Sequence, residues 1–251
     1  MTPDFYAVLD TMFYRLPEHE AMDHEWLYYF VTGNGGTIAD YEVLSIEQTD
    51  DTHAVATLLV RQVWPEGVNG AEDDEPEEHR LYMERQNGVW LMADFDEHKA
   101  DCRRYIANNR KEQAIREAIS TYLVNEISTY YLQGELCVPT LMIVAEEEPD
   151  SIHSIVWGDF WIIWYRHNGD SLEMVSGGNH SGCIRLTRED GKYVVTSFDQ
   201  TEDGAGNDPS ARRIFGPHYE LYQQMHSNDR VWEAVRKEQL EQYLRDKERI
   251  L

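Results

Sequence analysis

One stretch of the sequence occurs twice, and this repetition constrains the fold more than any other feature. LYMERQNGVWLMADFDE, residues 81–97, aligns without a gap with IRLTREDGKYVVTSFDQ, residues 184–200. Each copy has strand-like residues on both sides of Asn-Gly or Asp-Gly, which predicts a β-hairpin with a two-residue turn. A Phe-Asp pair in each copy, and an Arg-Arg pair further along, extend the match beyond the turn. The sequence therefore predicts two related units in tandem. The alternative is two unrelated hairpins that share turn chemistry.

The first predicted domain, residues 1–109, has helices before strands. Thr2 is a good N-cap and Pro3 a good first helical residue, so a helix is expected at the start. A second helix is predicted over 18–30. The strands predicted before the first hairpin are 41–48 and 53–63. Because both faces of 53–63 are apolar, that strand is expected to lie inside a covered sheet.

The second predicted domain, residues 110–251, repeats this order and adds a C-terminal helical extension. Apolar residues at three- and four-residue steps predict a helix over 110–131. The elements expected after it are strands over 137–146, 153–166 and 171–175, a glycine-rich connection over 176–182, the second hairpin, and helices over 210–226 and 229–250. The charged last helix carries a thin apolar stripe, which is typical of a lid over its own domain.

Charge and composition exclude several classes of function. The chain has 251 residues, 41% of them hydrophobic, and a formal net charge of −25. Nucleic acids and anionic membranes attract basic surfaces, so no nucleic-acid or membrane partner is expected. The three cysteines are too scattered for a disulfide framework and are expected to be buried thiols. No leader is visible at the first residues, which predicts a cytoplasmic protein, or an exported one if a leader was removed.

Metal and cofactor motifs are missing from the sequence. The ten histidines show no HxH or HExxH spacing, and neither a nucleophile elbow nor a Cys-His signature is present. The acidic run over 65–78 lacks the order of oxygen ligands that a calcium loop needs, so a solvated acidic loop is favoured. We therefore expect no metal and no cofactor.

The strand over 153–166 holds the first candidate site. Three tryptophans fall within eight residues, and one face of the strand presents Trp157, Asp159, Trp161 and Tyr165. An apolar wall with one placed polar group is typical of a ligand pocket. The alternative is a sheet core, in which Asp159 lies near a bulge or an edge. Trp161 and Trp164 are expected on opposite faces, both largely buried.

His180 and Asp199 complete the candidate set. His180 lies in the polar segment SGGNHSG and could act as a general acid or base, although a loop histidine is more often only solvated. Asp199 follows Phe198 at the position where Asp96 follows Phe95 in the first copy. Both aspartates could be bases at strand ends, but a cap on the following turn is favoured. We expect His180 on the surface, and Asp159 and Asp199 bound to backbone amides.

Residues 112–226 resemble a known superfamily. The segments that carry the resemblance are CVPTLMIVAEEE, VWGDFWIIWY, SGGNHSG, SFDQTEDGAGN and ARRIFGPHYELYQ. They are similar to uncharacterised bacterial proteins of the nuclear-transport-factor-2-like (cystatin-like cone) superfamily. The first domain resembles it only in its hairpin and its helix-then-sheet order. The resemblance implies an α+β fold of two tandem cone-shaped domains, each with an N-terminal helix on a curved antiparallel sheet. It brings no fixed activity, because the superfamily holds enzymes, adaptors and binding modules.

Three functions remain open on this basis. The first is a non-catalytic module that binds a small ligand or a protein, with an aromatic pocket in the second domain. The second is a proton-transfer enzyme of the isomerase or dehydratase type, in which a carboxylate and His180 line a cavity. The third is a structural protein that forms a homodimer through sheet faces.

Overall fold

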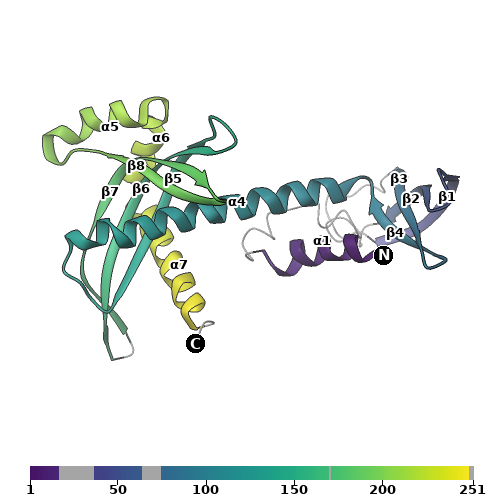
Figure 1. Ribbon diagram of the computed structural model, residues 1–251, viewed down its shortest axis with the longest axis horizontal. Coiled ribbons are helices and arrows are strands. Elements are labelled where there is room, and N and C mark those ends of the chain that lie inside the picture. Colours follow the sequence, from purple (N-terminus) through teal and green to yellow (C-terminus); the bar gives the residue numbers. More distant parts are fainter. Residues whose placement is uncertain (17–36, 64–74, 170, 249–251) are drawn as a thin grey trace. The chain divides into compact units, whose positions relative to one another are not determined.

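The computed structural model of the chain describes residues 1–16, 37–63, 75–169 and 171–248. Over these ranges it is a mixed α+β protein with two four-stranded antiparallel sheets. The chain divides into two compact units, Met1–Lys111 (unit 1) and Glu112–Leu251 (unit 2). Figure 1 labels the elements of both. The helix expected over 18–30, and most of the acidic run over 65–78, lie outside the described residues.

In the described part of unit 1, helix α1 comes before the sheet. Helix α1 (Pro3–Tyr14) begins as predicted, because the Thr2 side chain accepts a 3.3 Å hydrogen bond from the Phe5 amide. Strands β1 (Thr37–Gln48), β2 (His53–Val63), β3 (Glu77–Gln86) and β4 (Val89–Phe95) pair in sequence order, so β1 and β4 are the edges among the described strands. α1 packs on the helix that follows β4, where Met12 and Cys102 are fully buried.

The two faces of β2 differ, which corrects the prediction of a strand covered on both sides. Ala54 and Ala56 are buried on one face. On the other, Val55 and Thr57 are only half-buried. The reason lies in the neighbouring strands, because Arg80 lies beside Thr57 in the sheet and charged residues keep that face in water.

The repeated stretches occupy the same place in their sheets. β3 and β4 are the last two strands of the first sheet, and β7 (Ser171–Glu189) and β8 (Lys192–Gln200) are the last two of the second. Asn87 and Gly88 both have positive φ, as do Asp190 and Gly191. Both hairpins therefore have the turn that the Asn-Gly and Asp-Gly signals predict.

Helix α4 (His98–Asn125) begins twelve residues before the predicted start at 110. A short 3₁₀ helix, η1 (Ile127–Tyr130), follows it. The division between units falls within α4 rather than in a linker, so α4 contributes residues to both. Its later turns supply Ile115, Ile119 and Leu123, each fully buried, to the core of unit 2.

The sheet of unit 2 is covered on both faces. β5 (Leu136–Glu147), β6 (His153–Asn168), β7 and β8 pair in sequence order. On the first face, Phe160, Ile162 and Ile184 pack against α4. On the second, the C-terminal helices cover the sheet. These are α5 (Asn207–Phe215), α6 (Tyr219–His226) and α7 (Asp229–Glu248), with the 3₁₀ turns η2 (Gly204–Gly206) and η3 (Gly216–His218).

The glycine-rich segment over 176–182 is not a connection, as was expected, but part of β7. Gly178 pairs with Ile162 and Gly182 with Gly158 in a continuous ladder. These glycines serve close approach, because a side chain at Gly178 would collide with the hydroxyl of Tyr131. The single helix predicted over 210–226 is broken at Gly216, whose φ is +50°.

Candidate functional site

The aromatic row of β6 packs against helices of the same chain. The indole of Trp157 donates a 2.9 Å hydrogen bond to the carbonyl of Ile214 on α5. Trp161 stacks on Trp232 of α7, with ring centroids 5.1 Å apart. Tyr165 is buried in a cluster that includes residues of α7. The prediction that the last helix is a lid over its own domain is confirmed. The three rings are packed as in the sheet-core alternative.

Trp161 and Trp164 do lie on opposite faces of the sheet, but neither is fully buried. Trp161 is partly buried beneath α7, and its ring nitrogen has no hydrogen-bond partner among the described residues. Trp164 is partly buried on the α4 face and donates to the carbonyl of Ser128 over 3.2 Å. Alternation along β6 therefore predicted their directions correctly and overestimated their burial.

Asp159 is the centre of a buried polar cluster. Its side chain is 1% exposed, and its Oδ1 accepts hydrogen bonds from Asn179 and, over 2.8 Å, from Ser181. Its Oδ2 lies 2.8 Å from Nδ1 of His226 at the end of α6. Tyr222 donates to Ser181 over 3.2 Å. The expectation that Asp159 holds backbone amides is wrong, because its partners are side chains.

This cluster ties α6 to the sheet. A buried carboxylate is costly unless it is paired and hydrogen-bonded, and His226 provides the pair. The hydrogen bond to Asp159 raises the pKa of His226, against the opposing effect of burial. The sequence patterns did not single out His226. The available signal was Asp159 itself, because a carboxylate between apolar strand residues must have a polar partner.

His180 faces the α4 side of the sheet, beside Phe160 in the register, and is half-buried rather than on a surface turn. Its Nε2 lies 2.8 Å from the hydroxyl of Tyr131, and its Nδ1 lies 2.8 Å from the side-chain oxygen of Gln200. An amide oxygen only accepts, so Nδ1 donates to Gln200. Both ring nitrogens are thus occupied by neutral groups, and the carboxylate partner expected for proton transfer is not among them.

Asp96 and Asp199 have different surroundings although they recur in the sequence. Asp96 accepts a 2.5 Å hydrogen bond from the backbone amide of Arg80 and lies 2.7 Å from Nδ1 of His79. Both partners lie on the neighbouring strand β3, so the predicted cap on the following turn is wrong for Asp96. Asp199 instead forms a surface ion pair with Arg213 of α5, at 3.1 Å. The expectation of a backbone amide partner is wrong for Asp199.

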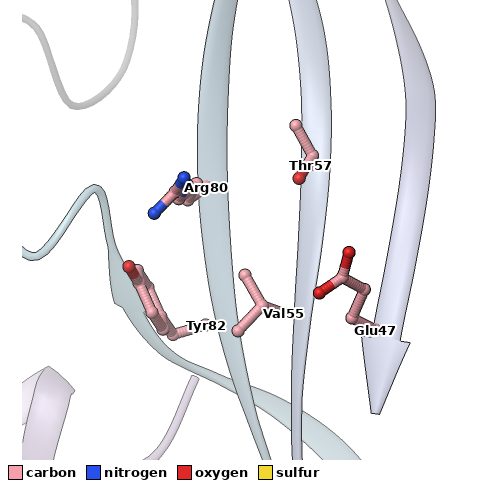
Figure 2. A pocket seen from close by; sticks show the side chains of 5 residues that line it. All are labelled: Glu47, Val55, Thr57, Arg80 and Tyr82. Carbon is pink, nitrogen blue, oxygen red and sulfur yellow. The ribbon is translucent and has the colours of Figure 1, made fainter. Parts of the chain in front are cut away.

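Unit 1 carries an open depression on the half-buried face of its sheet, with a volume of about 240 Å³. Five side chains from β1, β2 and β3 line it, namely Glu47, Val55, Thr57, Arg80 and Tyr82. Figure 2 shows Arg80 and Tyr82 on one side of Val55 and Glu47 on the other. The Tyr82 hydroxyl donates to Glu97 over 2.8 Å, and this hydrogen bond raises the pKa of Tyr82.

Strand β1 forms one wall of this depression and is also an edge of the sheet. It is twelve residues long, and several large apolar side chains on it are exposed. The exposed fractions are 68% for Tyr41, 48% for Val43, 44% for Leu44 and 67% for Ile46. An edge strand presents a row of unpaired backbone groups, and one with exposed apolar residues is a surface for pairing with another chain. The sequence predicted a strand over 41–48, but its pattern alone did not reveal this exposed surface.

The corresponding edge in unit 2 is covered. β5 is the edge strand there, and the side chain of Gln239 on α7 bonds to both backbone groups of Leu141. Gln239 accepts from the Leu141 amide and donates to its carbonyl, each over 2.8 Å. A side-chain amide thus takes the place of a neighbouring strand at this point.

Within the described ranges, no group of three or more His, Cys, Asp or Glu side chains is arranged to hold a metal ion. None of the helices in the same ranges combines the length and the apolar character of a membrane span.

Comparisons with known proteins add little to this geometry. No family model matches the sequence, and no curated protein matches it. A solved structure described as an Ntf2 like protein involved in plasmid conjugation is similar over 80% of this chain and 95% of that chain. Its sequence identity is 10% and its TM-score is 0.23, a value too low to carry an argument. The α+β class and the helix-then-sheet order therefore stand on the elements themselves.

Proposed function

We propose that this chain is a non-catalytic protein-binding module, and that its docking element is the edge strand β1 of unit 1. The observation that carries the proposal is the exposure of Tyr41, Val43 and Ile46 on a twelve-residue edge strand. A partner segment that adds a strand beside β1 would satisfy the backbone groups of the edge and cover these apolar side chains.

The contrast between the two units supports this assignment. Native proteins protect the edges of sheets by covering them or by shortening and charging them. β5 of unit 2 is covered by α7 through Gln239. β1 carries acidic residues on one face, but it keeps its full length and has three exposed apolar residues that point to the other face. We infer that β1 is left available because it binds a partner.

A binding role also fits the polar groups better than catalysis does. His180 has both nitrogens occupied by Tyr131 and Gln200. His226 pairs with Asp159, but that pair joins α6 to the sheet, and the depression lies in the other unit. A general acid or base needs an atom that is free to form a hydrogen bond with a substrate bound in a cavity. A small-ligand role in unit 2 would require displacement of α5 and α7 from Trp157 and Trp161.

Hydrogen exchange of the full chain tests the proposal. The probe is a neutral eight-residue peptide of alternating threonine and valine, which favours the extended conformation. We expect the peptide to slow the exchange of the amides over 37–48. Ile46→Lys should abolish this protection without a loss of stability, because Ile46 is 67% exposed. Val89→Lys is the matched control, since Val89 is 59% exposed on β4, the other edge.

Two results would contradict the proposal. The first is the absence of protection over 37–48 at a peptide concentration that saturates any binding. The second is equal protection in the Ile46→Lys variant, which would place the binding elsewhere.

We also propose that the two units arose from one duplicated unit, as the repeated hairpin suggests. The support is the shared position of β3–β4 and β7–β8 in their sheets and the shared turn geometry at Gly88 and Gly191. The test is a superposition of experimental structures of the two units. Hairpins that fail to coincide when the preceding strands are aligned would contradict it.

A further inference from the structure

The two faces of β1 have different chemistry. Tyr41, Val43 and Ile46 pair in the register with Val60, Leu58 and Ala56, and so share the apolar face of the sheet. Asp40, Glu42 and Glu47 pair with Arg61, Leu59 and Val55 on the face that carries the depression. A bulge between Val43 and Ser45 keeps the two rows in phase along the strand. β1 therefore offers an apolar row on one side and an acidic row on the other.

The acidic row is available for a cation. Glu42 and Glu47 are exposed, and no basic side chain within the described residues forms an ion pair with either. The charge of the surroundings has the same sign, because residues 1–111 contain 23 acidic and 9 basic residues. A strand added beside β1 would bring its side chains to about 5 Å from this row, where opposite charges attract and like charges repel.

We propose that the partner of β1 is an extended segment in which apolar residues alternate with lysine or arginine. This inference rests on the proposed function and names the chemistry of its partner. The apolar residues of the segment lie beside Tyr41, Val43 and Ile46, and its basic residues lie beside Glu42 and Glu47. Successive side chains of a strand point to opposite faces of the sheet. A segment with this alternation therefore places its apolar residues on one face and its basic residues on the other.

The shape of the depression favours a position next to Glu47 for a basic residue of the partner segment. Glu47 forms its outer wall, and Arg80 lies on the far side of Val55 (Figure 2). A lysine or arginine beside Glu47 can lay its aliphatic stem on Val55 and keep its charge at the carboxylate. Arg80 repels a cation that reaches further across the depression. The preference for a basic residue therefore arises at Glu47, on the edge strand.

The same charges disfavour a second copy of the chain as the occupant. Antiparallel pairing of β1 with β1 would set Asp40, Glu42 and Glu47 of one copy beside those of the other. Like charges directly opposite each other destabilise a strand pair. A basic segment removes this repulsion, which a second copy would create.

The test compares three eight-residue peptides in which valine alternates with lysine, threonine or glutamate, titrated into the full chain by fluorescence anisotropy. We expect the lysine peptide to bind about tenfold more tightly than the threonine peptide, since several exposed ion pairs each contribute modestly. The glutamate peptide should bind more weakly than both. Raising the salt concentration should shrink the lysine preference, because it screens exposed charges.

Variants separate the acidic row from the general charge of the chain. The double variant Glu42→Gln and Glu47→Gln should lose most of the lysine preference and keep its affinity for the threonine peptide. Glu78→Gln is the matched control, because Glu78 is an exposed glutamate on the same face but on β3 rather than at the edge. An equal loss of preference in Glu78→Gln would mean general attraction to an acidic protein and would overturn the inference.

The outcomes also separate this inference from the proposed function. If the threonine peptide binds β1 and the lysine peptide binds no better, the partner chemistry is wrong and the binding edge stands. If no peptide binds in a manner sensitive to Ile46→Lys, the proposed function itself falls. If sedimentation shows a dimer that Ile46→Lys dissociates, a second copy occupies β1 and the inference is overturned.

Discussion

Replacement of His226 with glutamine is expected to loosen the attachment of α7 to unit 2. His226 ends α6 directly before α7, and its Nδ1 lies 2.8 Å from the buried carboxylate of Asp159. A hydrogen bond to a charged group contributes about 1.5–3 kcal/mol. The His226 side chain is 39% exposed, so solvent weakens the interaction and about 1–2 kcal/mol is a reasonable loss.

Hydrogen exchange of the α7 amides measures this loss directly. A change of about 1–2 kcal/mol in local opening corresponds to roughly 5- to 30-fold faster exchange. The matched control is His153→Gln, because His153 lies 2.7 Å from Asp150 in a pair whose two side chains are both about half exposed. Exposed pairs contribute little, so His153→Gln should leave α7 unchanged.

The pKa of His226 also predicts how the attachment of α7 changes with pH. The pKa of His226 is raised in the folded chain. Its contribution is therefore complete below its ordinary pKa of about 6.5 and is lost as the pH rises through the folded-state value. Tyr222, which stacks on His226, stays neutral in this range because burial raises its pKa. In the wild type the protection factors of α7 should fall as the pH rises through the folded-state pKa of His226, and in His226→Gln they should stay level. Parallel pH profiles for the two proteins would refute the reasoning.

Three further predictions concern packing and thiols. Gln239→Ala removes both hydrogen bonds to Leu141, so α7 exchange should accelerate about fivefold, and an unchanged rate would show that the edge of β5 needs no cover. Gly178→Ala should lower the stability of the chain by about 1–3 kcal/mol in chemical denaturation, because the new methyl group meets the Tyr131 hydroxyl. The three buried thiols should not react with a thiol reagent at pH 8 until urea is added, since burial raises the pKa of Cys102 to about 11 and those of the other two as well.

Much of the fold was predictable because its signals are local. The turns at Gly88 and Gly191 follow from Asn-Gly and Asp-Gly, and the first helix follows from Thr2 and Pro3. The prediction of a connection over 176–182 was wrong for a physical reason. Its glycines resemble a loop in sequence, but their use is close approach to Tyr131 and to the neighbouring strands, which depends on residues far away in the chain.

The candidate site was less predictable, because its partners come from distant elements. Trp157 and Trp161 were identified as a wall, and alternation placed them on one face correctly. What covers that face is α5 and α7, which no local pattern could assign. The pairing of Asp159 with His226 depends in the same way on a contact across 67 residues. The alternation of apolar and acidic residues on β1 is visible in the sequence. That the apolar row is exposed could not be predicted without knowing that β1 is an edge strand.

The most direct test of the account is an NMR spectrum of the labelled full chain with the unlabelled lysine–valine peptide. We expect cross-strand contacts between peptide protons and the backbone protons of β1, with valine side chains near Tyr41 and Val43 and lysine side chains near Glu42. These contacts should vanish in Ile46→Lys. Contacts that map to α7 or β8, or a peptide that binds without any contact to 37–48, would contradict the claim that β1 is the binding edge.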